Sequence, residues 1–276
     1  EILAKVSYPD YNPNIFPNGV PPSQWKELSE NPDKPFINRA TYALYPPGST
    51  YKPFVAAMAL EKGIITANTI VAEARNKQWK PSGSWNAPPI SRTSHPDGDV
   101  NLDRALVWSD NIYFAWTSLK MGAELFESLS SKIGIGKPLP FNLPLSGSQL
   151  KNKDTPWSPH LLATSSFGQG EMLVTPLHIA TMYTAFVNQG DMVLPQIVKQ
   201  IESPKGDLIQ TFERKIWNEK ALSTKAIDTI LPSLINVIED PTGTGHRAYI
   251  EGLKIAGKTG TAQLDNQNKN EISWFV

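Results

Sequence analysis

The sequence predicts a mixed fold of helices and strands, in which the two ends of the chain supply a sheet and the middle is helical. Apolar, strand-like stretches occur at residues 2–8 and again at 255–263 and 272–276. Between them lie segments with the apolar spacing of helices and with recognisable helix ends. The chain has 276 residues, of which 40% are hydrophobic, so it is long enough to bury a sizeable core.

The first half of the chain starts with the strand expected at 2–8, followed by a loop rich in Pro and Asn up to about Asn38. The stretch VAAMALE at 55–61 predicts a helix, because it is apolar, free of helix breakers and followed by Gly63 as a stop. Residues 70–100 are rich in Trp, Pro, Ser and Gly and predict an ordered loop. Three helices are expected next, at 101–108, 112–121 and 124–134.

A long connection is expected up to Ser166, followed by a helix at 175–190. Thr175 is the expected N-cap of this helix, Pro176 occupies its first position and Gly190 ends it.

The last part of the chain predicts extended segments at 191–215 and an amphipathic helix at 223–239, bent near Pro232. Residues from about 64 to 190 are therefore expected to form a mainly helical subdomain, inserted between ends that form the sheet. Both ends of the chain look cut from the middle of strands, so the sequence is expected to be a piece of a longer protein.

Composition excludes several classes of function. Lys and Arg together number 26, as do Asp and Glu, and this zero net charge gives no electrostatic footprint for nucleic acid. The absence of cysteine excludes disulfides and zinc–thiolate sites. The four histidines have no paired metal-ligand spacing, so no metal or other cofactor is predicted. No apolar run approaches the ~18 residues that a membrane span needs.

The first candidate for catalysis is the stretch YPPGSTYKPF, in which Ser49 and Lys52 stand three residues apart at the start of a helix. Positions i and i+3 share one helix face, with Cβ atoms roughly 5–6 Å apart, so the two side chains can meet. A serine hydroxyl becomes a good nucleophile when a neighbouring base takes its proton. A lysine is such a base once burial and nearby cations lower its pKa. The alternative is a purely structural role, in which the stretch starts a helix and the lysine is exposed.

The second candidate is WSDNIYF, which places Ser109, Asp110 and Asn111 between two expected helices. Because each helix needs a cap, capping alone explains this stretch well. The functional alternative is that Ser109 relays a proton while Asn111 holds a substrate amide or orients the lysine.

The third candidate is GKTGTAQ, in which Lys258 stands in a strand between two glycines. Glycine inside a strand often marks the close approach of a ligand or of another backbone segment. Lys258 and Thr259 offer a cation and a hydroxyl to a carboxylate, and Thr261 offers a backbone N–H to an oxyanion. The alternative is a purely structural role, in which the stretch is an edge strand and the lysine is solvated.

Ser-x-x-Lys, Ser-x-Asn and Lys-Thr-Gly, in this order, form the motif set of penicillin-binding proteins and class A β-lactamases. Beyond the motifs, SFGQGEMLVTPLHIATMYTAFVNQG and GTGHRAYIEGLKIAGKTGTAQ resemble segments of one family, and the resemblance spans nearly the whole chain. The chain resembles the transpeptidase domain of a class B penicillin-binding protein. SDNIYFA and LPFNLPLSGSQL resemble the Gram-positive branch, which includes the low-affinity, methicillin-resistance type.

The resemblance implies that residues 1–276 are one transpeptidase domain with a central antiparallel sheet, flanking helices and a helical subdomain. The family's first strand would lie before Glu1, and its last strand and helix after Val276. The domain is therefore expected to be truncated at both ends. The resemblance also implies an enzyme on the outer face of the bacterial cell membrane, with a glycosyltransferase as partner.

The resemblance further implies the roles of the site residues. Ser49 would attack the bond between two terminal D-alanines of a peptidoglycan stem peptide, with Lys52 as base. Ser109 would pass the proton to the leaving nitrogen, and Asn111 would bind the substrate amide. Lys258, Thr259, Gly260 and Thr261 would bind substrate, and the N–H groups of Ser49 and Thr261 would form the oxyanion hole. β-Lactams would acylate Ser49.

Two alternatives on the same fold stay open at this point. One is a serine β-lactamase, which needs a group to activate water, and Glu171 is the formal candidate. The other is a β-lactam sensor, which is acylated but catalyses nothing.

Overall fold

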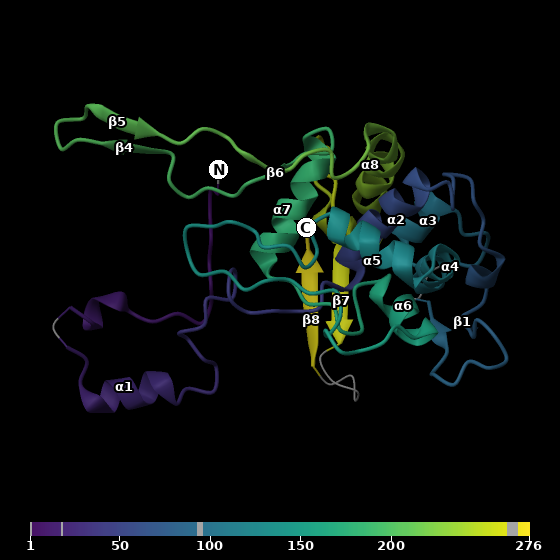
Figure 1. The fold of residues 1–276 in the computed structure, drawn as a ribbon, viewed down its shortest axis with the longest axis horizontal. Coiled ribbons are helices and arrows are strands. Elements are labelled where there is room, and N and C mark those ends of the chain that lie inside the picture. The colour runs from purple at the N-terminus through teal and green to yellow at the C-terminus, as the bar shows by residue number, and fades with distance from the viewer. Residues whose placement is uncertain (1, 18, 93–95, 264–269) are drawn as a thin grey trace.

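The computed structural model describes residues 2–17, 19–92, 96–263 and 270–276. Figure 1 shows a main body in which β7 and β8 stand beside a group of helices, while two arms project on the other side. The helices are α1 (Pro22–Ser29), α2 (Lys52–Glu61), α3 (Leu102–Val107), α4 (Asn111–Met121), α5 (Ala123–Lys132), α6 (Pro159–Ser165), α7 (Pro176–Val187) and α8 (Thr224–Glu239). Short 3-10 turns are η1 (Pro13–Ile15), η2 (Gly48–Tyr51), η3 (Ala72–Arg75) and η4 (His246–Ala248).

The strands in the described residues form antiparallel pairs. These are β1 (Gln78–Trp79) with β2 (Ile90–Ser91), β3 (Met192–Val193) with β6 (Ile216–Asn218), β4 (Gln200–Glu202) with β5 (Leu208–Thr211), and β7 (Thr259–Gln263) with β8 (Glu271–Phe275). The mixture of helices and antiparallel strands agrees with the predicted fold class. The helices α3–α7 lie in the span 64–190, but α8 also packs on α3, so the helical subdomain stays a prediction as a separate unit.

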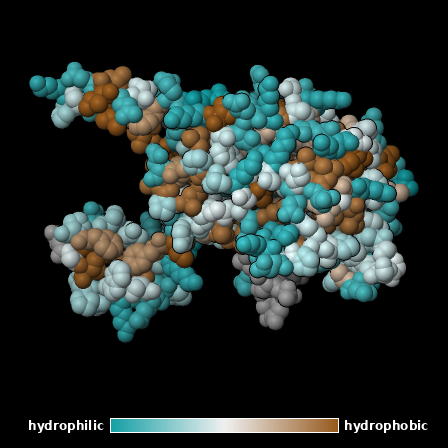
Figure 2. Space-filling view, in the orientation of Figure 1, coloured by the Kyte–Doolittle hydropathy of each residue, from teal (hydrophilic) through white to brown (hydrophobic). Residues whose placement is uncertain are grey.

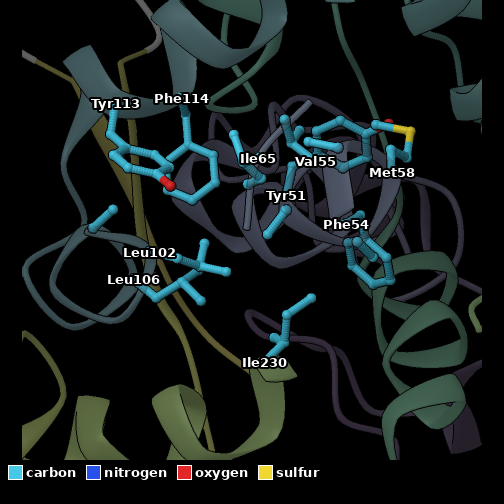
Figure 3. Close-up of a cluster of buried hydrophobic side chains, with 14 of the residues drawn as sticks. Tyr51, Phe54, Val55, Met58, Ile65, Leu102, Leu106, Tyr113, Phe114 and Ile230 are labelled. Carbon is cyan, nitrogen blue, oxygen red and sulfur yellow. The ribbon is translucent and has the colours of Figure 1, made fainter. Parts of the chain in front are cut away.

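The core is built around α2. This helix is apolar on all sides apart from Lys52 and Glu61 at its two ends, and its residues 52–59 are buried, as expected for a helix enclosed by others. Figure 3 shows side chains from the turn before α2, from α2 itself, from the loop after it and from α3, α4 and α8 meeting there: Tyr51, Phe54, Val55, Met58, Ile65, Leu102, Leu106, Tyr113, Phe114 and Ile230. The packing fixes the direction in which α2 presents its first turn.

Side-chain caps fix the helix starts near the site. Asp110 caps α4 and Thr175 caps α7, the latter as predicted from the sequence. Ser158 caps α6, a helix that the sequence prediction placed in a long connection. Its signal was Ser158 followed by Pro159 at the first helical position, which is a typical helix start.

The strand predicted at residues 2–8 is wrong. This segment makes a backbone hydrogen bond from Ile2 to the carbonyl of Gln196 at 2.8 Å and belongs to no described strand. Leu3, Val6 and Tyr8 are largely exposed. An alternating apolar pattern forms a strand only where a partner strand takes its hydrogen bonds, and none of the described strands lies beside it.

The two arms carry exposed apolar side chains. One arm is the β4–β5 hairpin, with Ile201, Leu208 and Ile209 on its surface, and the other holds α1 with Trp25 and Phe36. Figure 2 shows both as projections with hydrophobic atoms among hydrophilic ones. None of the described helices combines the length and the apolar composition needed to cross a bilayer.

Candidate active site

Ser49 lies in η2, the tight turn that leads directly into α2. Neighbouring elements hold this turn through its backbone. The hydroxyl of Tyr183 in α7 donates to the carbonyl of Thr50 at 2.7 Å, and the indole of Trp274 in β8 donates to the carbonyl of Pro46 at 3.0 Å. Ser49 itself is half-buried and faces a cleft. Its N–H lies in the first turn of a helix, where N–H groups lack intrahelical partners.

The turn packs closely against two other backbone segments. Gly48 has φ 55° and donates its N–H to the carbonyl of Gly168, which has φ 70°. A Cβ atom on Gly168 would lie 2.1 Å from the Gly48 carbonyl oxygen, and one on Gly48 would lie 2.7 Å from the Thr261 oxygen. Glycine is therefore required at both positions, for the left-handed backbone and for the space. The contact sets the distance between Ser49 and β7.

Lys52 is fully buried, and its amine points to the second motif. Its Nζ lies 2.5 Å from the carbonyl oxygen of Ser109, 2.8 Å from Oδ1 of Asn111 and 3.2 Å from Oγ of Ser109. In the described structure no hydrogen bond joins Lys52 to Ser49. The spacing predicted that Lys52 can meet Ser49, whereas packing gives the lysine partners in the second motif.

Ser109 stands between two amines. Its Oγ is 3.2 Å from Nζ of Lys52 and accepts a hydrogen bond from Nζ of Lys258 at 2.9 Å. Its φ of 57° is unusual for a residue with a side chain, and such strain tends to persist at functional sites. One hydroxyl in contact with two amines is suited to pass a proton between groups.

Burial changes the acidity of both lysines. It lowers the pKa of Lys52 well below its ordinary value, and the charge of Lys258 lowers it further, while Asp110 opposes the change. Burial also lowers the pKa of Lys258 to about 7. Both shifts arise because an ammonium ion loses hydration inside the protein. Neutral amines are therefore accessible near neutral pH.

The remaining members of the second motif hold the site in place. The amide of Asn111 bridges two elements, accepting from Lys52 and donating from Nδ2 to the carbonyl of Ser91 in β2 at 3.0 Å. Asp110 is buried and its carboxylate accepts the N–H of Tyr113 at 2.7 Å, so it caps α4 as the alternative interpretation proposed.

The strand β7 presents a free edge to the cleft. Lys258 and Val276 exchange both backbone hydrogen bonds, and the register pairs Thr261 with Ser273. Because bonded and non-bonded pairs alternate in an antiparallel ladder, the N–H and C=O groups of Thr259 and Thr261 point away from β8. The carbonyl of Thr261 accepts a hydrogen bond from the side chain of Gln169 at 3.4 Å on that side.

The missing side chain of Gly260 makes room for neighbouring protein atoms. A Cβ atom there would lie 2.9 Å from Cγ2 of Thr50 and 3.0 Å from the carbonyl oxygen of Pro47. Next to it, the hydroxyl of Thr259 donates to Oγ1 of Thr244 at 2.7 Å.

A cleft of about 1170 Å³ joins these parts. Ser49, Ser109, Asn111 and residues of the third motif line it, while Lys52 and Lys258 lie buried beneath. Sequence reasoning did not single out several other lining residues: His160, Phe167, Gln169, Thr244, Arg247 and Trp274. Two of these residues lie in glycine-rich stretches that could have pointed to them: Gln169 in GQG and Thr244 in GTG.

Glu171 does not line the cleft. Its two carboxylate oxygens accept hydrogen bonds from the N–H of Asn152 at 2.7 Å and from the hydroxyl of Thr155 at 2.9 Å. The carboxylate therefore fastens a loop. Among the described residues that line the cleft there is no Asp or Glu, so the β-lactamase alternative loses its candidate base.

A comparison with known protein families agrees with the family that the motifs indicate. The family described as "Penicillin binding protein transpeptidase domain" matches residues 1–276. The chain belongs to this family. Its relatives place it in class B, as the resemblance of its longer segments predicted.

The chain is 36% identical over 280 residues to "Penicillin-binding protein 3" of Bacillus subtilis, with 100% of this chain and 40% of that protein covered. It is 30% identical over 288 residues to "Peptidoglycan D,D-transpeptidase MrdA" of Haemophilus influenzae, covering 98% of this chain and 42% of the relative. The chain thus spans less than half the length of these relatives.

A solved structure of penicillin-binding protein A from M. tuberculosis, an imipenem acyl-enzyme complex, has a TM-score of 0.87 and 27% identity, over 100% of this chain and 62% of that one. A second complex of that protein, with ceftriaxone, has a TM-score of 0.85 at 26% identity. That protein therefore holds two different β-lactams as acyl-enzymes on the same fold.

Proposed function

We propose that this chain is the D,D-transpeptidase unit of a peptidoglycan-synthesising enzyme and that it forms an acyl-enzyme at Ser49. The observation that carries the proposal is the convergence of two buried amines on Ser109 Oγ, beside Ser49 and the free edge of β7. Relatives named as D,D-transpeptidases and β-lactam acyl-enzymes on the same fold support it.

In the first step Ser49 Oγ attacks the carbonyl carbon of the penultimate D-alanine of a stem peptide. A C–O bond forms, the peptide C–N bond breaks and the terminal D-alanine leaves. Lys52 accepts the proton of Ser49, which requires a neutral amine, and its lowered pKa supplies one. The partners of the Lys52 amine in the structure are Ser109 and Asn111, and catalytic hydrogen bonds often tighten only in the complex with substrate.

Ser109 then delivers a proton to the leaving nitrogen. It can take a replacement from either lysine, since both lie within hydrogen-bonding distance of its Oγ. The N–H groups of Ser49 and Thr261 face the developing oxyanion, and one such donor typically contributes about 2.7–4 kcal/mol of transition-state stabilisation. Asn111 orients Lys52 and binds the substrate amide.

The substrate lies along β7 as an added strand, paired with the outward N–H and C=O groups of Thr259 and Thr261. In the second step an amine of a neighbouring stem peptide attacks the ester carbon. A new amide bond forms and Ser49 is released with its proton restored. This substrate exists outside the cytoplasm, so the enzyme works on the outer face of the cell membrane, with a glycosyltransferase that makes the glycan as its partner.

Intact-protein mass spectrometry with benzylpenicillin tests the proposal, with Ser49→Ala as the control. A stable mass gain of one drug molecule, absent in the variant, is expected. A gain that disappears while hydrolysed drug accumulates would instead indicate a β-lactamase.

A turnover assay distinguishes a transpeptidase from a β-lactam sensor. The protein is given a D-alanyl thioester as acyl donor together with an acceptor amine. A transpeptidase turns over and forms the amide product, whereas a sensor is acylated once and stops.

A further inference from the structure

The cleft has one exposed cation. Among the described residues that line it, Arg247 alone carries a permanent positive charge, and no acidic residue lines it. The two lysines of the motifs are fully buried beneath the floor. A ligand carboxylate that enters the cleft therefore meets Arg247 as its first full positive charge.

Lys258 is poorly placed to touch such a carboxylate. Its Nζ donates to Ser109 Oγ at 2.9 Å and to the carbonyl of Thr259 at 3.0 Å, and the side chain has no exposed surface. To reach the cleft it would have to break both hydrogen bonds. Its position instead serves Ser109, so the direct carboxylate contact falls to another residue.

Arg247 is also the exception among the arginines of the chain. The other five donate hydrogen bonds to acids, amides or carbonyl groups: Arg39, Arg75, Arg92, Arg104 and Arg214. Within the described part of the chain Arg247 has neither a hydrogen bond nor an ion pair, and its side chain is exposed. An arginine fork without a protein partner is free for a bidentate contact with a carboxylate.

The turn that carries Arg247 is fixed against the body of the protein. Thr244 donates its N–H to the carbonyl of Val107 in α3 at 3.1 Å, and Gly245 donates to Val237 in α8 at 3.0 Å. Thr244 also accepts the hydroxyl of Thr259. The cationic group and a pair of hydroxyls thus line the same cleft on a rigid support.

We propose that Arg247 binds the C-terminal carboxylate of the acyl donor, whether stem peptide or β-lactam. Lys258 then acts on Ser109 rather than on the carboxylate. This inference rests on the proposed transpeptidase function and names the residue that selects its substrate by charge.

The test compares two acyl donors, N-benzoyl-D-alanyl thioglycolate and its methyl ester, which differ only in the negative charge. The measured quantity is the ratio of their second-order rates of acylation at Ser49. In Arg247→Gln the ratio of acid to ester should fall about 10- to 100-fold, the usual size of a hydrogen bond to a charged group. Arg247→Lys should give an intermediate ratio, because it keeps the charge and loses the fork.

Lys254→Gln is the matched control, since Lys254 is an exposed cation on the following segment that borders a neighbouring hollow instead of the cleft. Its ratio should equal that of the wild type. An unchanged ratio in both Arg247 variants, or equal losses for acid and ester, would overturn the inference. If neither compound acylates Ser49 in the wild type, the transpeptidase proposal fails first, and the two failures are thereby distinguished.

Discussion

Replacing Gly168 by alanine tests whether close backbone packing places the nucleophile. The new Cβ atom would lie 2.1 Å from the carbonyl oxygen of Gly48, the residue before Ser49. Non-bonded carbon and oxygen atoms need more than 3 Å, so one of the two segments must move by about 1 Å. A displacement of 1 Å at a catalytic group reduces rates by about 100-fold. We therefore expect acylation by benzylpenicillin to fall by about that factor.

Gly63→Ala separates this clash from backbone strain. Gly63 has φ 65°, close to the 70° of Gly168, but a Cβ atom there would have no atom within 4 Å. Both variants carry the strain of a left-handed alanine, about 1–2 kcal/mol. Both should therefore lose a few degrees of melting temperature.

The assay is the second-order rate constant of acylation, followed by a fluorescent penicillin, beside a thermal melt. Gly63→Ala should keep the wild-type rate, while Gly168→Ala loses it in a folded protein. Equal acylation rates in the two folded variants would refute the reasoning, because the Gly48–Gly168 contact would then have no influence on Ser49.

Three further predictions concern the lysines and the hydroxyl pair. Lys52→Met should reduce acylation by at least ~100-fold without lowering the melting temperature, because it removes the base and a costly buried amine; a normal rate, measured with fluorescent penicillin, would show that Lys52 is not the base. Folding lowers the pKa of Lys258 from 10.5 to about 7, so the unfolded chain binds more protons between these pH values and the free energy of unfolding should rise with pH across that window. Denaturant titrations should find this slope smaller in Lys258→Met, and identical slopes would contradict the burial effect. Thr259→Val removes the hydrogen bond to Thr244, in the turn that carries Arg247, and should slow acylation by carboxylate-bearing donors about tenfold, with little change for the methyl ester.

Several elements could be predicted from the sequence because their signals are local. The cap of α7 at Thr175 and the helices α3 to α5 follow from capping residues and apolar spacing within a few turns. The strand expected at 2–8 failed because a strand depends on a partner that its own residues do not specify. The helix α6 was missed although Ser158 and Pro159 mark its start, because the segment was interpreted as part of a long connection.

The sequence by itself determined the chemical groups available to this protein: three short motifs, in a fixed order, that supply a serine hydroxyl beside a helix start, two amines and a strand with hydroxyl groups. Only the tertiary structure decided how these groups meet. It gave Lys52 and Lys258 a common partner in Ser109 and left Arg247 at the cleft without a partner among the described residues. The physical reason is that spacing along a helix fixes geometry within one turn, whereas contacts between distant segments, and the burial that lowers a lysine pKa, depend on how the whole chain packs.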